Sequence, residues 1–296
     1  MKRLGRATRS AAGPYDRPLS RDVYQHPPRR LGTAEQRVTR RSLFGLGSTP
    51  PAAREVDYEA LTARVRAAWE RPGGRVLLRA LEPVAEIAAG LAHVGPGMRV
   101  LDAGGSDGNV ERACAARGAE APECGLAQAE ALPFADGEFD AALSCFGAAL
   151  LARPSLVVRE LCRVVRPGGA VVLTAWVTRG LPGRLHEVAE LLEPLPQGVA
   201  SPAEWGREAI ARQRLAGPLE DIELRTRTVR LRFDDADAAF EALSAWTMLE
   251  DSELAALRPD FDRLLASQNN SRNGVEIDAR YLIASGRRRM APVPSG

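Results

Sequence analysis

Three glycines and two carboxylates lie together in residues 102–108, which read Asp-Ala-Gly-Gly-Ser-Asp-Gly. A short apolar run at 100–101 precedes them and indicates a buried strand that Asp102 closes. Residues 109–117 then have the pattern of a helix that ends at Gly118. A strand, a glycine-rich turn and a helix in this order form a nucleotide-binding opening, because glycine lacks Cβ and the helix N-terminus attracts an anion. The spacing differs from the dinucleotide G-x-G-x-x-G pattern, so a cofactor of another kind is expected.

Three segments resemble the class I S-adenosylmethionine (SAM) methyltransferases. The loop at 102–108 is similar to their D-x-G-x-G-x-G loop, with Ser106 in place of the middle glycine. Residues 129–134, AEALPF, resemble the adenine-side motif D-A-x-x-L-P-F, with Gln128 where the acid normally stands. The most specific likeness is that of residues 161–176, LCRVVRPGGAVVLTAW, to LxRVLRPGGxLVLTxW of the quinone-type and other small-molecule methyltransferases (methyltransferase type 11).

This resemblance covers about residues 57–287 and implies a fold. That fold is α/β, a doubly wound, mostly parallel Rossmann-like sheet with helices on both faces, an N-terminal helical cap and an antiparallel edge strand. It also implies SAM as the cofactor and methyl transfer to a small molecule as the activity. The cofactor contacts carried over from the family motifs are Asp102, Gly104, Gly105, Ser106, Gly108, Glu123, Gln128, Ala129, Ser144 and Phe146.

Residues 119–128 depart from the family pattern. A doubly wound fold places its second strand here, and an acid at the end of that strand bonds the ribose. Pro122 and two glutamates make a poor central strand, and the following helix is missing. Glu123 is the best-placed acid and Glu120 the second. A shortened, degenerate unit leaves a rival hypothesis open, that of a methyltransferase-like scaffold or partner-binding protein that has lost its cofactor.

His186 is the candidate for a catalytic base. Methyl transfer is a direct displacement, so a base is needed only where the acceptor must lose a proton. His186 lies in a helix after the fifth family strand, and a purely structural role for it is the alternative. We expect the acceptor to be held by a substrate-side insertion at 177–220 and by the N-terminal helices. A nicotinamide-dependent oxidoreductase is disfavoured, because the glycine spacing is wrong and the usual ribose acid is missing.

Periodicity and turn residues predict the remaining elements. Helices are expected from Asp57 to the Pro72-Gly73-Gly74 stop, at 76–91 with a kink at Pro83, and at 156–165, 186–193, 202–215, 235–246 and 251–267, the last broken at Pro259. Strands are expected at 139–146, 170–176, 222–233 with a bulge near Thr228, and 275–283. The domain should span 55–290, with Arg287–Arg289 solvated and a tail at 291–296.

Charge is spread unevenly along the chain. Residues 1–54 hold twelve Lys and Arg against three acids, a net charge of +9, and the formal +2 of the whole chain leaves −7 for the rest. Their Arg, Pro and Gly content predicts a disordered basic arm. Nucleic-acid binding by this arm is allowed by charge but is not expected, because no aromatic residues or binding motif accompany it.

Composition also bounds the location and the metal chemistry. Thr39–Phe44 resembles a twin-arginine export signal, but no apolar segment follows it. No apolar run is long enough to span a membrane. The four cysteines are ten to twenty-one residues apart without a C-x-x-C pair, so we expect reduced thiols, no metal site and a cytoplasmic protein. The oligomeric state is left open.

Overall fold

Six strands form one sheet in the order β2-β1-β3-β4-β6-β5 within residues 56–105, 107–125 and 128–290, the part of the chain that this computed structural model describes. Their bounds are β1 Val100–Ala103, β2 Glu123–Cys124, β3 Phe139–Ser144, β4 Val165–Trp176, β5 Leu219–Phe233 and β6 Val275–Arg288. β6 runs antiparallel to both of its neighbours, and β1 to β4 pair in parallel. The prediction of a doubly wound, mostly parallel sheet is confirmed, with its antiparallel pairing at the β5 edge. The basic arm predicted at 1–54 and the tail at 291–296 lie outside the described residues.

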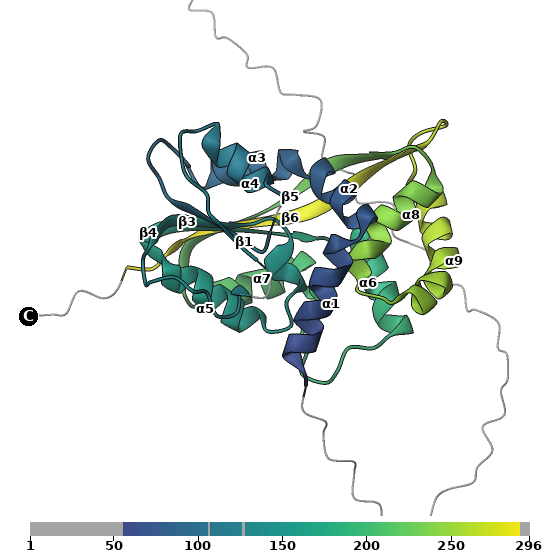
Figure 1. The fold of residues 1–296 in the computed structure, drawn as a ribbon, viewed down its shortest axis with the longest axis horizontal. Coiled ribbons are helices and arrows are strands. Elements are labelled where there is room, and N and C mark those ends of the chain that lie inside the picture. The colour runs from purple at the N-terminus through teal and green to yellow at the C-terminus, as the bar shows by residue number, and fades with distance from the viewer. Residues whose placement is uncertain (1–55, 106, 126–127, 291–296) are drawn as a thin grey trace, which may run out of the picture. The chain divides into compact units, whose positions relative to one another are not determined.

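Helices cover both faces of the sheet, as predicted. Figure 1 shows α3 and α4 over one face and α5 and α7 over the other, while α1, α2, α6, α8 and α9 gather beside one end of the sheet. Their bounds are α1 Tyr58–Glu70, α2 Pro72–Ala80, α3 Glu82–Leu91, α4 Asn109–Ala115, α5 Pro154–Val164, α6 Leu181–Leu192, α7 Glu208–Leu215, α8 Ala236–Ser244 and α9 Asp251–Gln268. Short 3₁₀ turns lie at η2 Gly147–Leu150, η3 Pro202–Gly206 and η4 Ala245–Thr247.

Three local predictions are wrong. The bulge in β5 lies between Glu220 and Glu223 and not near Thr228, where pairing with β6 is continuous. The alternation slips near Thr228 because residues 225–228 are exposed on both faces of this edge strand. α9 runs unbroken through Pro259, since buried residues on both sides of the proline anchor the helix in the core. The prediction that Arg287–Arg289 are solvated is wrong for Arg288, which is half-buried in β6 and donates to the carbonyls of Arg163 and Val165, whereas Arg287 and Arg289 are exposed.

The sheet ends abruptly at β2. This strand has two residues, Glu123 and Cys124, which pair with Asp102 and Ala103 of β1. The Asp102 N–H donates to the Pro122 carbonyl at 3.0 Å, so the proline takes part as an acceptor at the edge, where its missing N–H does no harm. Beyond β2 the described residues contain no further strand. The sequence prediction of a shortened second unit thus corresponds to a sheet edge placed directly beside β1.

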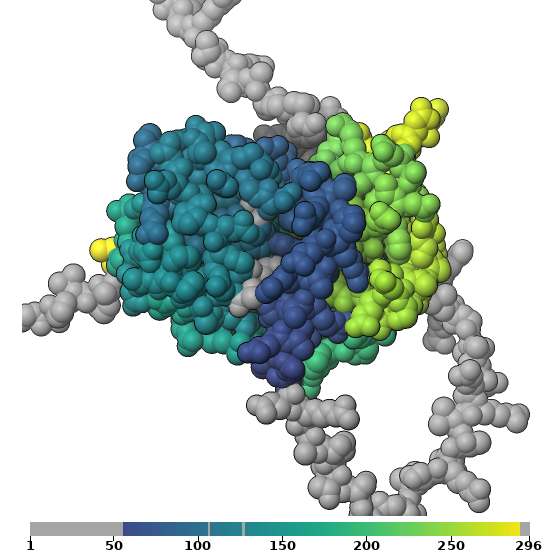
Figure 2. All heavy atoms as spheres, in the orientation of Figure 1, coloured from purple at the N-terminus to yellow at the C-terminus, as the bar shows by residue number. Residues whose placement is uncertain are grey.

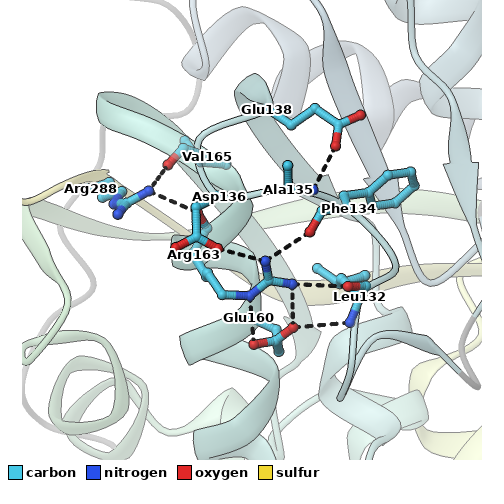
Figure 3. A network of polar contacts seen from close by, with 9 residues as sticks. All are labelled: Leu132, Phe134, Ala135, Asp136, Glu138, Glu160, Arg163, Val165 and Arg288. Carbon is cyan, nitrogen blue, oxygen red and sulfur yellow. Dashed lines mark hydrogen bonds and ion pairs between the residues drawn. The ribbon is translucent and has the colours of Figure 1, made fainter.

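Residues 129–136, which follow β2, are held by α5 instead of by a strand. Arg163 donates to the carbonyl oxygens of Leu132 and Phe134 at 2.9 and 2.8 Å. It also donates to Asp136 at 2.8 Å and to both carboxylate oxygens of Glu160. Glu160 in turn accepts from the Leu132 N–H at 3.0 Å (Figure 3). Hydrogen bonds to charged groups are the stronger kind, so this Arg163 clamp replaces the pairing that a strand would supply.

A second ion pair fixes the beginning of the same segment. Glu130 accepts from the backbone N–H of Arg153 at 3.0 Å and from its Nε at 2.8 Å. Arg153 directly precedes α5, whereas Arg163 lies in its last turn. The segment between β2 and β3 is therefore pinned at two points to one helix.

Replacing Arg163 by Met tests this clamp. The substitution keeps the apolar stem but leaves the Glu160 carboxylate and two backbone carbonyls without their donor. We expect the free energy of unfolding to fall by about 2–3 kcal/mol in urea titrations. The matched control is Arg159→Met, one turn earlier on α5 and exposed, which should change stability by less than about 0.5 kcal/mol. Equal losses in the two variants would contradict the clamp.

Candidate functional site

The loop after β1 has a backbone that favours glycine. Gly104, Gly105 and Gly108 have φ angles of 109°, 70° and 75°. Asp107 is the non-glycine exception at 54°, in a region that Asp tolerates better than most residues. Successive residues of this kind turn their N–H groups toward one side, a conformation that binds anions. The positive φ angles explain why glycine occupies these three positions of the motif, as the sequence predicted. Ser106 lies outside the described residues.

This loop sits where the winding of the sheet reverses. The chain leaves β1 toward β2 on one side and returns to β3 on the other, so a crevice opens at the carboxyl ends of these strands. At that point η2 approaches the loop so closely that a Cβ on Gly147 would lie 2.7 Å from the Gly104 carbonyl oxygen. Asn109, which is buried at the start of α4, donates to the Leu78 carbonyl at 2.7 Å. The loop is therefore held in place by η2, which follows β3, and by α2.

A cleft of about 720 Å³ opens over the loop. Figure 2 shows the hollow between the surface of α1 and α2 and the surface formed by the half of the chain that contains β1 and α4. Its wall consists of Arg66, Trp69, Glu70, Arg75, Leu78, Gly104, Gly105, Asp107, Gly108, Glu111, Glu123, Gly125 and Gln128. Five of the ten residues predicted to contact a cofactor share this wall, namely Gly104, Gly105, Gly108, Glu123 and Gln128.

Glu123 is the acid that the short edge strand presents to the cleft. Its register partner is Asp102, so it stands at the carboxyl end of β2 beside the end of β1. Its side chain extends over the loop, because a Cβ on Gly105 would lie 3.0 Å from Glu123 Oε1. Glu120, the second candidate in the sequence, bridges to Arg99 at the other end of β1 and is not part of the wall. Between the two acids, the geometry favours Glu123.

Four other predicted residues are not part of the cleft wall. Asp102, Ala129, Ser144 and Phe146 are all buried. The Ser144 hydroxyl accepts from the backbone N–H of residue 148 at 2.9 Å, which orders the turn after β3. Phe146 belongs to a packed aromatic cluster and stacks on Trp176 with ring centroids 4.2 Å apart. Contact between these four residues and a cofactor stays a prediction.

The N-terminal helices supply residues that sequence reasoning missed. Arg66, Trp69 and Glu70 of α1 and Arg75 of α2 line the cleft opposite the loop. Arginines on amphipathic helices look like ordinary surface residues in a sequence. The sequence indicated only that a helical cap precedes the loop, and not which of its side chains face the cleft. Their positions give this side of the cleft two cationic groups, one carboxylate and one large aromatic surface.

His186 is not brought to the cleft. It lies on α6 with 4% of its surface exposed and lines a separate, smaller cavity. Burial lowers the pKa of its imidazole to about 4, so the ring is neutral at pH 7. A neutral imidazole can accept a proton or a hydrogen bond, but the structure gives it no place beside Glu123 or the loop.

Among the described residues, no group of three His, Cys, Asp or Glu side chains could hold a metal ion. The cleft wall presents backbone N–H groups, two arginines, four carboxylates, an amide and an aromatic face. These groups suit an organic ligand that carries hydroxyl groups and an anionic end.

Comparison with known proteins shows similarity to a family of methyltransferase domains. The family model of a methyltransferase domain matches residues 85–173, a stretch that contains the glycine loop, β3 and the Arg163 clamp. An uncharacterized protein of Mycobacterium bovis is 30% identical over 263 residues, which cover 76% of this chain and 90% of that protein.

Two methyltransferases named by their reactions show more limited similarity. A ubiquinone/menaquinone biosynthesis C-methyltransferase of Laribacter hongkongensis is 30% identical over 108 residues, 28% of this chain and 44% of that enzyme. A structure of phosphoethanolamine N-methyltransferase 2 from Haemonchus contortus, in complex with phosphomonomethylethanolamine and S-adenosylhomocysteine, is 14% identical with a TM-score of 0.45. The matched region covers 76% of this chain and 60% of that enzyme's chain.

Gly147 and Gly90 form a matched pair for testing the packing of the loop. Gly147→Ala should destabilise the protein by about 1–3 kcal/mol, because the new Cβ would press on the Gly104 backbone. Gly90 lies in α3 with open space around it, so Gly90→Ala should raise stability by about 0.5–1 kcal/mol. Chemical denaturation of both variants measures this, and a neutral Gly147→Ala would contradict the close approach.

His186 predicts a dependence of stability on pH. The unfolded imidazole binds a proton near pH 6.5, whereas the buried one does so near pH 4. The unfolded state therefore binds more protons, and the free energy of unfolding should fall as the pH is lowered from about 6.5 to about 4. The loss attributable to His186 is on the order of 3 kcal/mol. Comparing the chain with His186→Leu by urea titration at each pH isolates it, and identical slopes would contradict the assignment.

Proposed function

This chain belongs to the class I SAM-dependent methyltransferases, and we propose on that premise that it transfers a methyl group from SAM to a small molecule. Because one fold hosts many functions, the proposal needs support from the site itself. That support is the cleft at the carboxyl ends of β1 and β2, where Gly104, Gly105 and Glu123 face the same hollow.

The cleft fits SAM in size and in its polar groups. Its volume of about 720 Å³ lies within the range of roughly 300–1,000 Å³ that is usual for small-molecule sites. The carboxylate of Glu123 would accept hydrogen bonds from the ribose hydroxyls. The Cys124 thiol donates to Gln128 Oε1 at 3.3 Å, which leaves the amide NH₂ of Gln128 as a donor for an adenine nitrogen.

Charge in the cleft suits the amino-acid end of the cofactor. Asp107 would repel a carboxylate there, but it pairs with Arg79 at 3.6 Å. Arg66 and Arg75 line the same cleft, and we assign them to the SAM carboxylate, with the N–H groups of the loop and of the α4 start beside them. The acid that opens the loop, Asp102, would orient the loop from below.

The chain's part in the reaction is alignment. SAM supplies a methyl group on a sulfonium, which a nucleophile can displace directly. Holding the reacting groups in line accounts for much of the rate in such a displacement. Trp69 stacks on Trp246 with centroids 5.4 Å apart, so the aromatic part of the cleft wall on this side is held in a fixed position against which the cofactor can be aligned.

We further propose that the acceptor is a small molecule and that the protein works in the cytoplasm. The acceptor would enter on the side of the 177–220 region and the N-terminal helices. All four cysteines are free and buried, which suits a reducing compartment. None of the helices among the described residues has the length and apolar character needed to cross a membrane.

A second candidate is a methyltransferase-like scaffold that does not bind SAM. The observation that favours it is the two-residue β2, which leaves Glu123 on an edge strand paired on one side with β1 and, among the described residues, with no strand on the other. The two candidates differ in one measurable quantity, the affinity for the cofactor.

Calorimetric titration of the full chain with S-adenosylhomocysteine separates them. We expect binding, and we expect Glu123→Gln to weaken it about tenfold to hundredfold, because hydrogen bonds to a charged acceptor contribute about 1.5–3 kcal/mol. The control is Glu120→Gln, which removes the same charge outside the cleft and should leave the affinity unchanged. Absence of heat at high micromolar ligand would favour the scaffold, and equal affinities of the two variants would place the ribose elsewhere.

A further inference from the structure

A second, smaller cavity of about 120 Å³ lies beside α1 and α6. Most of its wall is apolar. The lining residues are Leu61, Arg64, His186, Ala189, Glu190, Glu193, Pro194, Leu195, Pro196, Pro202, Thr247, Met248 and Leu249. They come from the first helix, from α6 and the segment after it, and from the turn before α9. The sequence predicts that the acceptor is held by residues 177–220 and by the N-terminal helices, and both segments contribute to this wall.

The carboxylates and the hydroxyl group of this wall have hydrogen-bond partners, whereas Arg64 Nε is buried without one. Arg64 donates to both carboxylate oxygens of Glu193, at 2.9 and 2.6 Å. Glu190 accepts from the Ser201 hydroxyl, and the hydroxyl of Thr247 donates to a backbone carbonyl at 2.7 Å. His186 has no hydrogen-bond partner among residues 56–105, 107–125 and 128–290, although only 4% of it is exposed.

The ring nitrogens of His186 face the cavity. They are not among the fully enclosed polar atoms that lack a partner, and His186 lines the cavity wall, so a ligand there can reach them. Burial keeps the His186 ring neutral by lowering its pKa to about 4. A neutral imidazole has one nitrogen that accepts a hydrogen bond and one that donates. The cavity therefore holds an unused hydrogen-bonding group inside an apolar wall.

The size and charge of the cavity limit what it can hold. An apolar cavity of about 150 Å³ binds benzene, so this one is close in size to a single six-membered ring. Arg64 and Glu193 neutralise each other, and burial raises the pKa of Glu190. Little net charge is left to attract an ion, and a carboxylate ligand would face two glutamates. A neutral hydroxyl group suits these surroundings best.

We propose that this cavity binds a single ring that carries a hydroxyl group, with the hydroxyl donating its hydrogen bond to His186. The cavity adjoins the cofactor cleft through one aromatic pair. Trp69 lines the cleft and stacks on Trp246, and the next residue, Thr247, lines the cavity. The claim that the hydroxylated ring is the methyl acceptor rests on the proposed function. The claim that the cavity binds such a ring does not.

Phenol and toluene are matched probes, because they differ in the hydroxyl group and are similar in size. Their affinities for the full chain would be measured by saturation-transfer NMR without any cofactor. We expect phenol to bind about tenfold more tightly than toluene, and we expect this preference to disappear in His186→Leu while toluene still binds. The control His93→Asn, which changes an exposed histidine, should keep the preference.

A second readout does not depend on a variant that folds. The chain has three histidines, so the imidazole carbon–hydrogen signal of His186 can be followed directly, and it should shift with phenol and much less with toluene. Equal affinities in the unchanged chain, an undisturbed His186 signal, or a phenol preference that survives His186→Leu would overturn the proposal. A phenol preference in a chain that fails to bind S-adenosylhomocysteine would support the cavity's ligand class and overturn its role as acceptor site.

Discussion

Arg163 holds together the part of the molecule that the sheet leaves unsupported. Its guanidinium donates to two backbone carbonyls and two carboxylates, and its hydrogen bond lowers the pKa of Glu160. In a doubly wound sheet with more strands on this side, pairing between strands would hold this part of the chain in place. Here the edge lies at β2, and charged hydrogen bonds from α5 fix the return path to β3. The position of Gln128 in the cleft depends on that support, because residues 129–136 follow it directly.

The cleft itself follows from two close approaches. A short edge strand pairs Glu123 with Asp102, and this pairing places a carboxylate over the glycine loop. On the other side, Gly147 lets η2 approach the Gly104 backbone. Neither of these close approaches requires another strand on the outer side of β2. The shortened unit therefore removes sheet area and a helix, but it retains the arrangement of loop and acid on which the cofactor proposal rests.

Sequence patterns predicted the elements in which one residue type has a single structural meaning. The glycines of the loop required positive φ angles. Residues 161–176 carried the end of a helix and a buried strand, which the structure contains as α5 and β4, although β4 begins at Val165 and includes the predicted turn residues 167–169. The roles of Trp69 and Arg75 could not be predicted, because their neighbours across the cleft are distant in sequence. His186 was a catalytic candidate by residue type, yet tertiary packing put it in a separate cavity. Periodicity reports which face of a helix is buried and not what that face meets.

The central claim is that a sheet ending at β2 still forms a cofactor site between the loop and Glu123. Hydrogen–deuterium exchange of the full chain, with and without S-adenosylhomocysteine, tests it most directly because it maps where a ligand orders the backbone. The account predicts slower exchange in peptides covering 104–110 and 123–130, with residues 219–233 of the far edge strand unchanged. Protection confined to other segments, or no protection at saturating ligand, would contradict it.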